Sequence, residues 1–137
     1  MGDGDQSLLS ITLDGHTSAD KARRYREERI NYWNNYQRRK ASHYYHHELT
    51  RIYQFLVPAN CRVLELGCGE GDLLAALQPS HGVGVDFSPQ MIRQARLRHP
   101  ELDFVLADVH EARIQDKFDY VILSDLVNDL WDVQRCI

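Results

Sequence analysis

Three glycines at alternate positions form the part of the sequence best suited to binding a cofactor. The stretch VLELGCGEGDLL runs from an apolar segment directly into Gly67, Gly69 and Gly71. Because glycine has no Cβ, such a loop can turn sharply and let its backbone approach a ligand closely. Two acids flank the loop, Glu65 before it and Asp72 after it. This pattern predicts a site for a nucleotide or another adenosine-bearing cofactor.

The residues around the glycines separate the candidate ligands. A phosphate-binding P-loop needs a Gly-Lys-Ser/Thr ending, and no lysine lies near this loop. The dinucleotide fingerprint G-x-G-x-x-G would require a third glycine where this chain has Asp72. A carboxylate there would repel a pyrophosphate, so an NAD-dependent oxidoreductase is disfavoured. Acids at Glu65 and Asp72 suit a ligand with positive charge, such as a sulfonium that also carries an ammonium.

Two further acids follow apolar segments. Asp86 comes about 20 residues after the first loop glycine, where an acid accepts hydrogen bonds from ribose hydroxyls. The alternative for Asp86 is a capping role at the helix that begins beside Ser88. For Asp108 the structural alternative is an Asp turn at the entry to a loop.

These residues lie within a pattern of short apolar strands that alternate with helices. We expect strands at residues 62–66, 82–87, 102–108 and 118–125, and helices at residues 72–78, 89–99 and 126–136. Ser88-Pro89 supplies an N-cap followed by proline at the first helical position. Such alternation predicts an α/β fold with a parallel sheet and helices on both faces. Ligands of such sheets bind beyond the carboxyl ends of the strands.

The chain divides into three parts, of which only the last contains the alternating strands and helices. Residues 1–17 show no sustained period and predict a flexible tail. Residues 18–57 form an N-terminal helical segment, with helices expected at 19–36 and 41–55. Residues 58–137 form a partial Rossmann-like domain.

Four motifs in order resemble the class I S-adenosylmethionine-dependent methyltransferases. ELGCGEG resembles their glycine-rich motif I, GVDFSPQMIRQAR their second strand and helix, LADVHE their third strand and FDYVILSDLVNDLWD their fourth. The N-terminal helices and the last motif also resemble bacterial methyltransferase domains that can be fused to glycosyltransferases. The resemblance implies about four strands in the order 3-2-1-4, truncated relative to the seven-stranded fold of the family.

The resemblance also implies roles for individual residues. Asp86 binds the ribose, and Phe87 beside it lies against the adenine or packs in the core. Asp108 accepts a hydrogen bond from the adenine amine, with the backbone of Val109 beside it. Glu65 lies near the methionine end of the cofactor, although a structural ion pair would also explain this acid. The predicted cofactor-binding set is Glu65, Gly67, Cys68, Gly69, Gly71, Asp86, Phe87, Asp108, Val109, Ser124 and Asp125.

Several other polar residues have weaker assignments. Ser124, Asp125 and Asn128 either contact the methionine moiety or the methyl acceptor, or cap a helix. Cys68 is a small filler within the glycine loop. The tyrosines proposed as a lid over the cofactor are Tyr36, Tyr44 and Tyr45. The helical spacing of His43, His46 and His47 could hold a metal, but we expect none because no further acid or cysteine lies in register.

The sequence thus predicts the cofactor-binding portion of a methyltransferase that uses S-adenosylmethionine. Methyl transfer from a sulfonium is an in-line displacement, so alignment of the acceptor dominates and we assign no catalytic residue. The acceptor is unknown, with a small molecule or sugar favoured. The alternative is a non-catalytic module for an adenosine ligand or for assembly. An exposed apolar edge at the fourth strand predicts a dimer or a partner that covers it, with weak binding and little turnover by this chain alone.

Composition limits the remaining classes. The 137 residues are 43% hydrophobic and 26% charged, as in soluble globular domains. No apolar run approaches the roughly 20 residues that cross a bilayer, and no signal peptide is evident. Three cysteines without paired spacing favour a reduced, cytoplasmic protein. Residues 18–51 carry nine Lys or Arg against four Asp or Glu, but the interspersed acids favour solvated helices over a nucleic-acid surface.

Overall fold

The computed structural model describes residues 18–36 and 42–124, and its first two elements are helices. α1 spans Ser18–Tyr36 and α2 spans Ser42–Leu56. Both predicted N-terminal helices are confirmed. α2 ends before Pro58, because a proline disfavours helical geometry in the residue that precedes it. The tail predicted at residues 1–17 lies outside the described residues.

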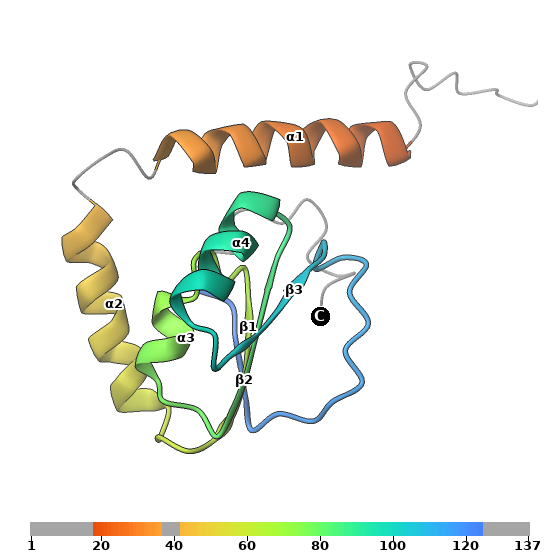
Figure 1. Cartoon of the computed structure of the whole chain (residues 1–137). Coiled ribbons are helices and arrows are strands. Elements are labelled where there is room, and N and C mark those ends of the chain that lie inside the picture. Colours follow the sequence, from red (N-terminus) through yellow and green to blue (C-terminus); the bar gives the residue numbers. More distant parts are fainter. Residues whose placement is uncertain (1–17, 37–41, 125–137) are drawn as a thin grey trace, which may run out of the picture.

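Four parallel strands make up the sheet (Figure 1). They are β1 (Arg62–Leu66), β2 (His81–Asp86), β3 (Asp103–Leu106) and β4 (Tyr120–Ile122), in the spatial order β3-β2-β1-β4. Helix α3 (Asp72–Ala76) connects β1 to β2, and α4 (Pro89–Arg98) connects β2 to β3. The predicted parallel sheet and its order 3-2-1-4 are therefore confirmed.

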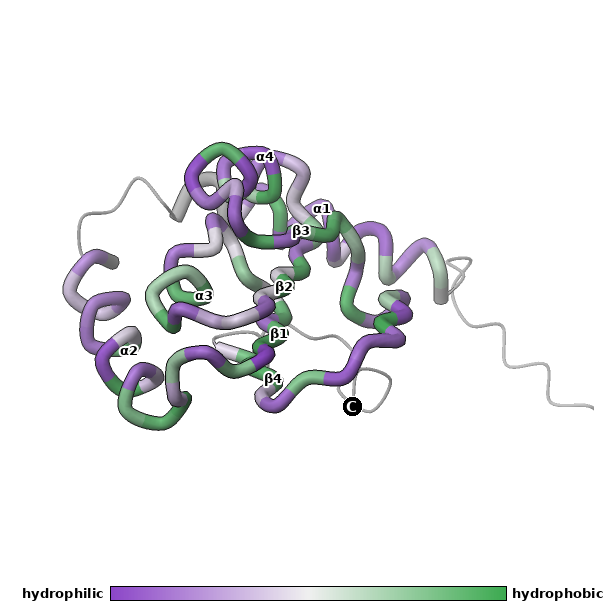
Figure 2. Tube along the Cα trace, turned by 60° about the horizontal axis from the view of Figure 1, so that its bottom comes forward, coloured by the Kyte–Doolittle hydropathy of each residue, from purple (hydrophilic) through white to green (hydrophobic). Residues whose placement is uncertain are grey.

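Alternation along the strands gives the sheet two apolar faces. On one face Val63, Phe104 and Ile122 pack with residues of α3 and α4 and with Val57 just after α2. On the other, Leu64, Val83 and Val85 pack against side chains of the irregular segment 107–118. Figure 2 shows the strands stacked in order between α2 and α3 on one side and this segment on the other.

Helices were expected on both faces of the sheet. Among the described residues α2, α3 and α4 all lie on the first face, and the second is covered by residues 107–118 without a helix. The helix expected at residues 126–136 lies outside the described part of the chain. The Ser88 hydroxyl caps α4 as expected, accepting a hydrogen bond from the Met91 N–H at 3.4 Å.

The two edges of the sheet differ in their surroundings. Within the described residues β4 pairs with β1 alone, and Val121 on β4 is 53% exposed. This agrees with the expected apolar edge, although a covering dimer or partner stays a prediction. At the other edge the Arg96 side chain of α4 donates to the Phe104 carbonyl of β3 at 2.8 Å. Helix α1 lies beyond the end of the sheet near the exit of β3 (Figure 1).

Candidate functional site

The glycine loop leaves β1 in a conformation that ordinary residues rarely adopt. Gly67, Gly69 and Gly71 have φ angles of 76°, 54° and 79°. The N–H groups of Gly67 and Cys68 both donate to the Val85 carbonyl, at 2.8 and 3.0 Å. These bonds hold the loop against the end of β2, so its shape does not depend on a ligand.

The glycines are required for different reasons. A Cβ built on Gly69 would have no atom within 4 Å, so this position faces open space. A Cβ on Gly71 would lie 2.6 Å from the Phe104 ring. Gly71 therefore permits close packing of the loop on β3, whereas Gly69 leaves room for a ligand. The predicted ligand contact fits Gly69 better than Gly71.

Cys68 points its side chain into the core. It is 7% exposed, and burial raises the pKa of its thiol far above the usual range. Its sulfur lies 2.8 Å from the place where a Cβ on Gly84 would be, so that glycine provides the space. The interpretation of Cys68 as a small filler agrees with this position, and only its backbone is available to a cofactor.

Asp86 joins the glycine loop to the start of α4. One carboxylate oxygen accepts from the Gly69 N–H at 2.9 Å, and the other accepts from the Ser88 N–H at 2.8 Å. Burial raises the pKa of Asp86 above its usual range, while these backbone hydrogen bonds oppose the rise. A carboxylate accepts about four hydrogen bonds, so Asp86 keeps some accepting capacity beyond its backbone donors Gly69, Ser88 and Phe87. The structural and the ribose-binding roles considered for Asp86 are therefore compatible.

Glu65 is the most deeply buried acid of the site. It is 2% exposed on β1, and its Oε1 accepts from the Ser124 hydroxyl at 3.3 Å. Its Oε2 has no hydrogen-bond partner among the described residues. Burial raises its pKa to about 8, and the Ser124 hydroxyl and the Leu74 backbone only partly oppose this. No positive side chain pairs with Glu65 in the described part of the chain, so the ion-pair alternative finds no support there.

This orphaned oxygen tests whether the site fits a cationic cofactor. A buried carboxyl oxygen without a partner costs about 1–3 kcal/mol, more when it is charged. A ligand ammonium would supply both the missing donor and the missing charge. Together with the open space at Gly69, the residues present fit the methionine end and the ribose of S-adenosylmethionine.

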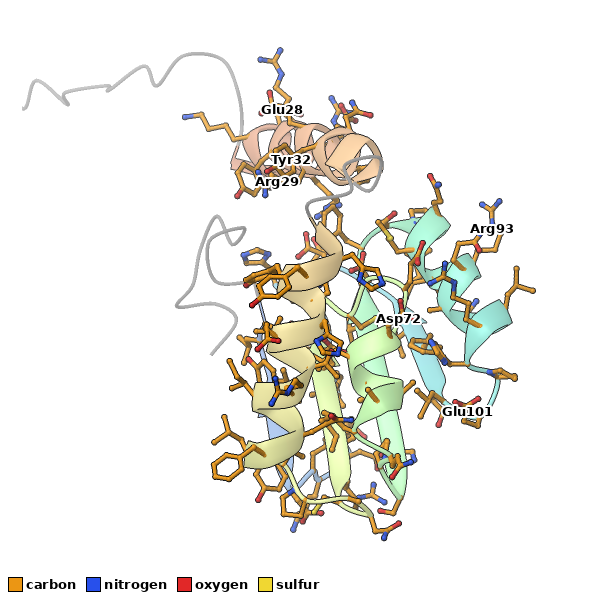
Figure 3. The ribbon with its side chains drawn as sticks, turned by 90° about the vertical axis from the view of Figure 1, so that its left-hand side faces the viewer. Glu28, Arg29, Tyr32, Asp72, Arg93 and Glu101 are labelled. Atoms are coloured by element: carbon orange, nitrogen blue, oxygen red, sulfur yellow. The ribbon has the colours of Figure 1, made fainter. Side chains whose placement is uncertain are left out.

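Asp72 requires a correction. We expected its charge to face the ligand, but its carboxylate pairs with Arg98 at 3.1 Å and with His99 at 2.8 Å. Figure 3 labels Asp72 between α3 and α4. Arg98 also pairs with Glu70 of the loop at 2.6 Å. Because both partners lie at the end of α4, the Asp72 side chain is held toward that helix. Asp72 links the start of α3 to the end of α4 through these pairs and does not indicate which ligand binds.

Asp108 lies just after β3 and shows the turn that was the structural alternative. Its Oδ1 accepts from the His110 N–H at 2.9 Å and lies 2.7 Å from His110 Nδ1. Its Oδ2 lies 2.9 Å from Nε and 2.7 Å from Nη2 of Arg26 on α1. Burial would raise the pKa of Asp108, but the hydrogen bonds from His110 and Arg26 outweigh it and hold the pKa below its usual range. The adenine-binding role stays a prediction.

Sequence reasoning missed Arg26 and His110. Arg26 lies 82 residues from Asp108 in the sequence, and nothing in the helical pattern distinguishes it from the other arginines of α1. His110 is 8% exposed. A histidine two residues after a strand-end aspartate was a usable signal, because an Asp turn places that backbone and ring beside the carboxylate.

The structure describes some of the remaining predicted site residues and not others. Phe87 follows β2 and is partly buried, and Val109 packs on the second face of the sheet. Tyr44 and Tyr45 of the proposed lid are 76% and 45% exposed on α2. The side chain of Tyr36, together with Asp125 and Asn128, lies outside the described residues.

Membrane-spanning helices and metal-binding clusters are both absent from the described residues. Neither α1, α2 nor any other described helix has the length and apolarity to span a bilayer. No group of three or more His, Cys, Asp or Glu side chains in residues 18–36 and 42–124 is placed to hold a metal ion.

Comparison with known families decides the class of the domain. A family described as "Methyltransferase domain" matches residues 63–137, from β1 through the glycine loop onward. The chain belongs to this family. The resemblance to class I S-adenosylmethionine-dependent methyltransferases is thereby confirmed.

Curated relatives of this methyltransferase domain are much longer proteins. The chain is 35% identical over 81 residues to the bifunctional methionine biosynthesis protein MetXA/MetW of Rhodopirellula baltica, covering 50% of this chain and 13% of that protein. It is 33% identical over 85 residues to the malonyl-[acyl-carrier protein] O-methyltransferase of Bacillus cereus, covering 58% and 32%. The chain thus spans less than a third of either relative.

Solved structures agree on the fold. A TehB-like S-adenosylmethionine-dependent methyltransferase from Corynebacterium glutamicum superposes with a TM-score of 0.50 at 25% identity, covering 55% of this chain and 42% of that one. The YcgJ protein of Bacillus subtilis gives a TM-score of 0.60 at 21% identity, covering 66% and 43%. At that identity the second likeness shows the fold alone.

Proposed function

We propose that this methyltransferase domain binds S-adenosylmethionine beyond the carboxyl ends of β1, β2 and β3 and delivers its methyl group to an acceptor. The observation that carries the proposal is the buried, unpartnered Oε2 of Glu65 beside a loop whose Gly69 faces open space. Family membership and the likeness to an S-adenosylmethionine-dependent enzyme from Corynebacterium glutamicum support the same ligand.

Each end of the cofactor has a partner in this proposal. Glu65 receives the ammonium, and the Asp86 carboxylate accepts hydrogen bonds from the ribose hydroxyls. Asp108 and the backbone of Val109 recognise the adenine, and Phe87 lies against its ring. Ser124 holds Glu65 in place through the hydrogen bond at 3.3 Å.

Methyl transfer from S-adenosylmethionine requires few catalytic side chains. S-adenosylmethionine supplies an activated methyl group on a sulfonium. The protein then has to orient the cofactor and exclude water while the acceptor attacks in line. None of the described residues is assigned as a catalytic base. A small molecule or a sugar is the acceptor class we propose, following the resemblance to domains fused to glycosyltransferases.

Isothermal titration calorimetry with S-adenosylhomocysteine, S-adenosylmethionine and NAD⁺ tests the proposal. We expect heat for the first two and none for NAD⁺. Glu65→Gln and Asp86→Asn should each weaken S-adenosylhomocysteine binding about tenfold or more, as expected for losing a hydrogen bond to a charged group. Glu101→Gln and Asp103→Asn are matched controls, because these acids are exposed at the amino end of β3.

The controls should bind as the wild type does. Binding of another adenosine ligand, with no heat from either methyltransferase ligand, would instead support the non-catalytic module. Equal affinity of Glu65→Gln and the wild type would remove the observation on which the proposal rests.

A further inference from the structure

Four nitrogen atoms lie close to the Asp108 carboxylate. Each of its oxygens has two nitrogen atoms within 2.9 Å, from His110 at one oxygen and from Arg26 at the other. An ionised carboxylate accepts about four hydrogen bonds in all. The adenine amine therefore has to compete with these nitrogen atoms for Asp108 while both neighbours stay in place.

The two neighbours are not equally able to leave. His110 is two residues away and belongs to the same turn, where its backbone N–H donates at 2.9 Å. Its ring is buried, at 8% exposure. Arg26 comes from α1, is 34% exposed, and has a second carboxylate nearby in Glu111 at 3.5 Å. Arg26 is thus the exchangeable donor.

We propose that Arg26 competes with the adenine amine for Asp108, so that α1 lowers the affinity of this site for its cofactor until Arg26 moves away. The proposal rests on the proposed function, since it takes Asp108 to be the adenine acceptor. Glu111, 71% exposed and already 3.5 Å from Arg26 Nη2, can receive the displaced guanidinium at little cost. Figure 1 shows α1 as a separate helix at the end of the sheet, where such a movement leaves the core intact.

The direction of the effect is unusual for a residue at a binding site. Removing Arg26 should strengthen binding, because the ligand no longer has to break an ion pair before Asp108 can accept. The pair is partly exposed and charge-assisted, so we expect the dissociation constant of Arg26→Ala to fall about three- to tenfold. Arg23→Ala is the matched control, because Arg23 lies on the same helix, is 69% exposed and pairs with Asp20.

A double-mutant cycle with S-adenosylhomocysteine tests this competition. Dissociation constants are measured by calorimetry for the wild type, Arg26→Ala, Asp108→Ala and the double variant, with Arg23→Ala as control. Arg26→Ala should bind more tightly than the wild type, and Arg23→Ala should bind equally. In the Asp108→Ala background the Arg26 substitution should change nothing, because the contested acceptor is gone.

The possible results are distinct. Weaker or unchanged binding by Arg26→Ala would overturn the proposal, because Arg26 would then support the site or be irrelevant to it. Tighter binding that persists in the Asp108→Ala background would also overturn it, since Arg26 would act elsewhere. No binding of S-adenosylhomocysteine by the wild type is a failure of the proposed function itself. Helical content measured by circular dichroism identifies any variant in which α1 has unfolded, and tighter binding by such a variant would count against competition at Asp108.

Discussion

Glu65 should make the stability of the domain fall as the pH rises. Its pKa in the folded chain is raised from 4.5 to about 8 by burial. Between these two values the folded chain holds a proton that the unfolded chain has released. With respect to this group, stability is therefore highest and constant below about pH 4.5, decreases as the pH rises toward 8, and levels off above.

The size of the effect follows from the same two values. At pH 6 about 1% of the folded molecules have an ionised Glu65, and at pH 9 about nine-tenths do, whereas the unfolded chain is ionised throughout. Between pH 6 and pH 9 this group alone should lower the free energy of unfolding by about 3 kcal/mol. Glutamine has nearly the same shape as glutamate and does not ionise. The free energy of unfolding of Glu65→Gln should therefore lack this pH-dependent contribution.

Urea unfolding followed by far-ultraviolet circular dichroism at pH 6, 7, 8 and 9 measures the effect. The informative quantity is the difference between the wild type and Glu65→Gln at each pH, because other titrating groups contribute equally to both. From pH 6 to pH 9 we expect the free energy of unfolding of Glu65→Gln to rise by about 3 kcal/mol relative to that of the wild type. A constant difference would refute the reasoning, because it would mean that Glu65 titrates at its ordinary pKa.

Four substitutions test other parts of the site. Gly71→Ala should destabilise the domain by about 2–4 kcal/mol in urea unfolding, because the backbone there is left-handed and the new methyl group would overlap Phe104. Gly69→Ala faces open space, so it should lower the free energy of unfolding by only about 1–2 kcal/mol. It should, however, weaken cofactor binding. Ser88→Ala should cost about 1 kcal/mol through loss of the N-cap of α4, and a larger loss would indicate a role beyond capping. Asp86→Asn should raise the dissociation constant for S-adenosylhomocysteine without removing the sheet, which circular dichroism would verify.

Local patterns were enough to predict the elements that form the sheet. The apolar run before the glycines, Ser88-Pro89 at the start of α4 and Pro58 after α2 each act on their own neighbours, so their positions could be predicted within a few residues. The order of the strands came from the family resemblance, since hydrophobic patterning does not encode it. Glu65 could have been predicted to be buried, because it lies two residues after Val63 and therefore on the same face of β1.

Contacts between distant elements could not be predicted in the same way. Asp72 was expected to face the ligand, but whether it turns to the loop or to Arg98 depends on how α3 and α4 pack. The Arg26–Asp108 pair depends likewise on where α1 lies relative to the exit of β3. The close approach of Gly71 to the Phe104 ring could likewise not be predicted from the motif, and its contact with a ligand stays a prediction. In each case a residue type was recognised and its partner was set by three-dimensional packing.

The case for a cationic ligand consequently rests on Glu65 and no longer on Asp72. An exposed carboxylate such as Asp72 discriminates weakly between ligands, because it already has partners in Arg98 and His99 and solvent screens its charge. Glu65 is different, since with a pKa of about 8 it is mostly neutral at pH 7 and ionises only if a positive group arrives. An ammonium would draw the proton off, so its affinity should rise with pH until about 8. A phosphate would require the proton to stay, so its affinity should fall over the same range. The sign of the pH dependence therefore reports the charge of whatever lies beside Glu65, independently of any family resemblance.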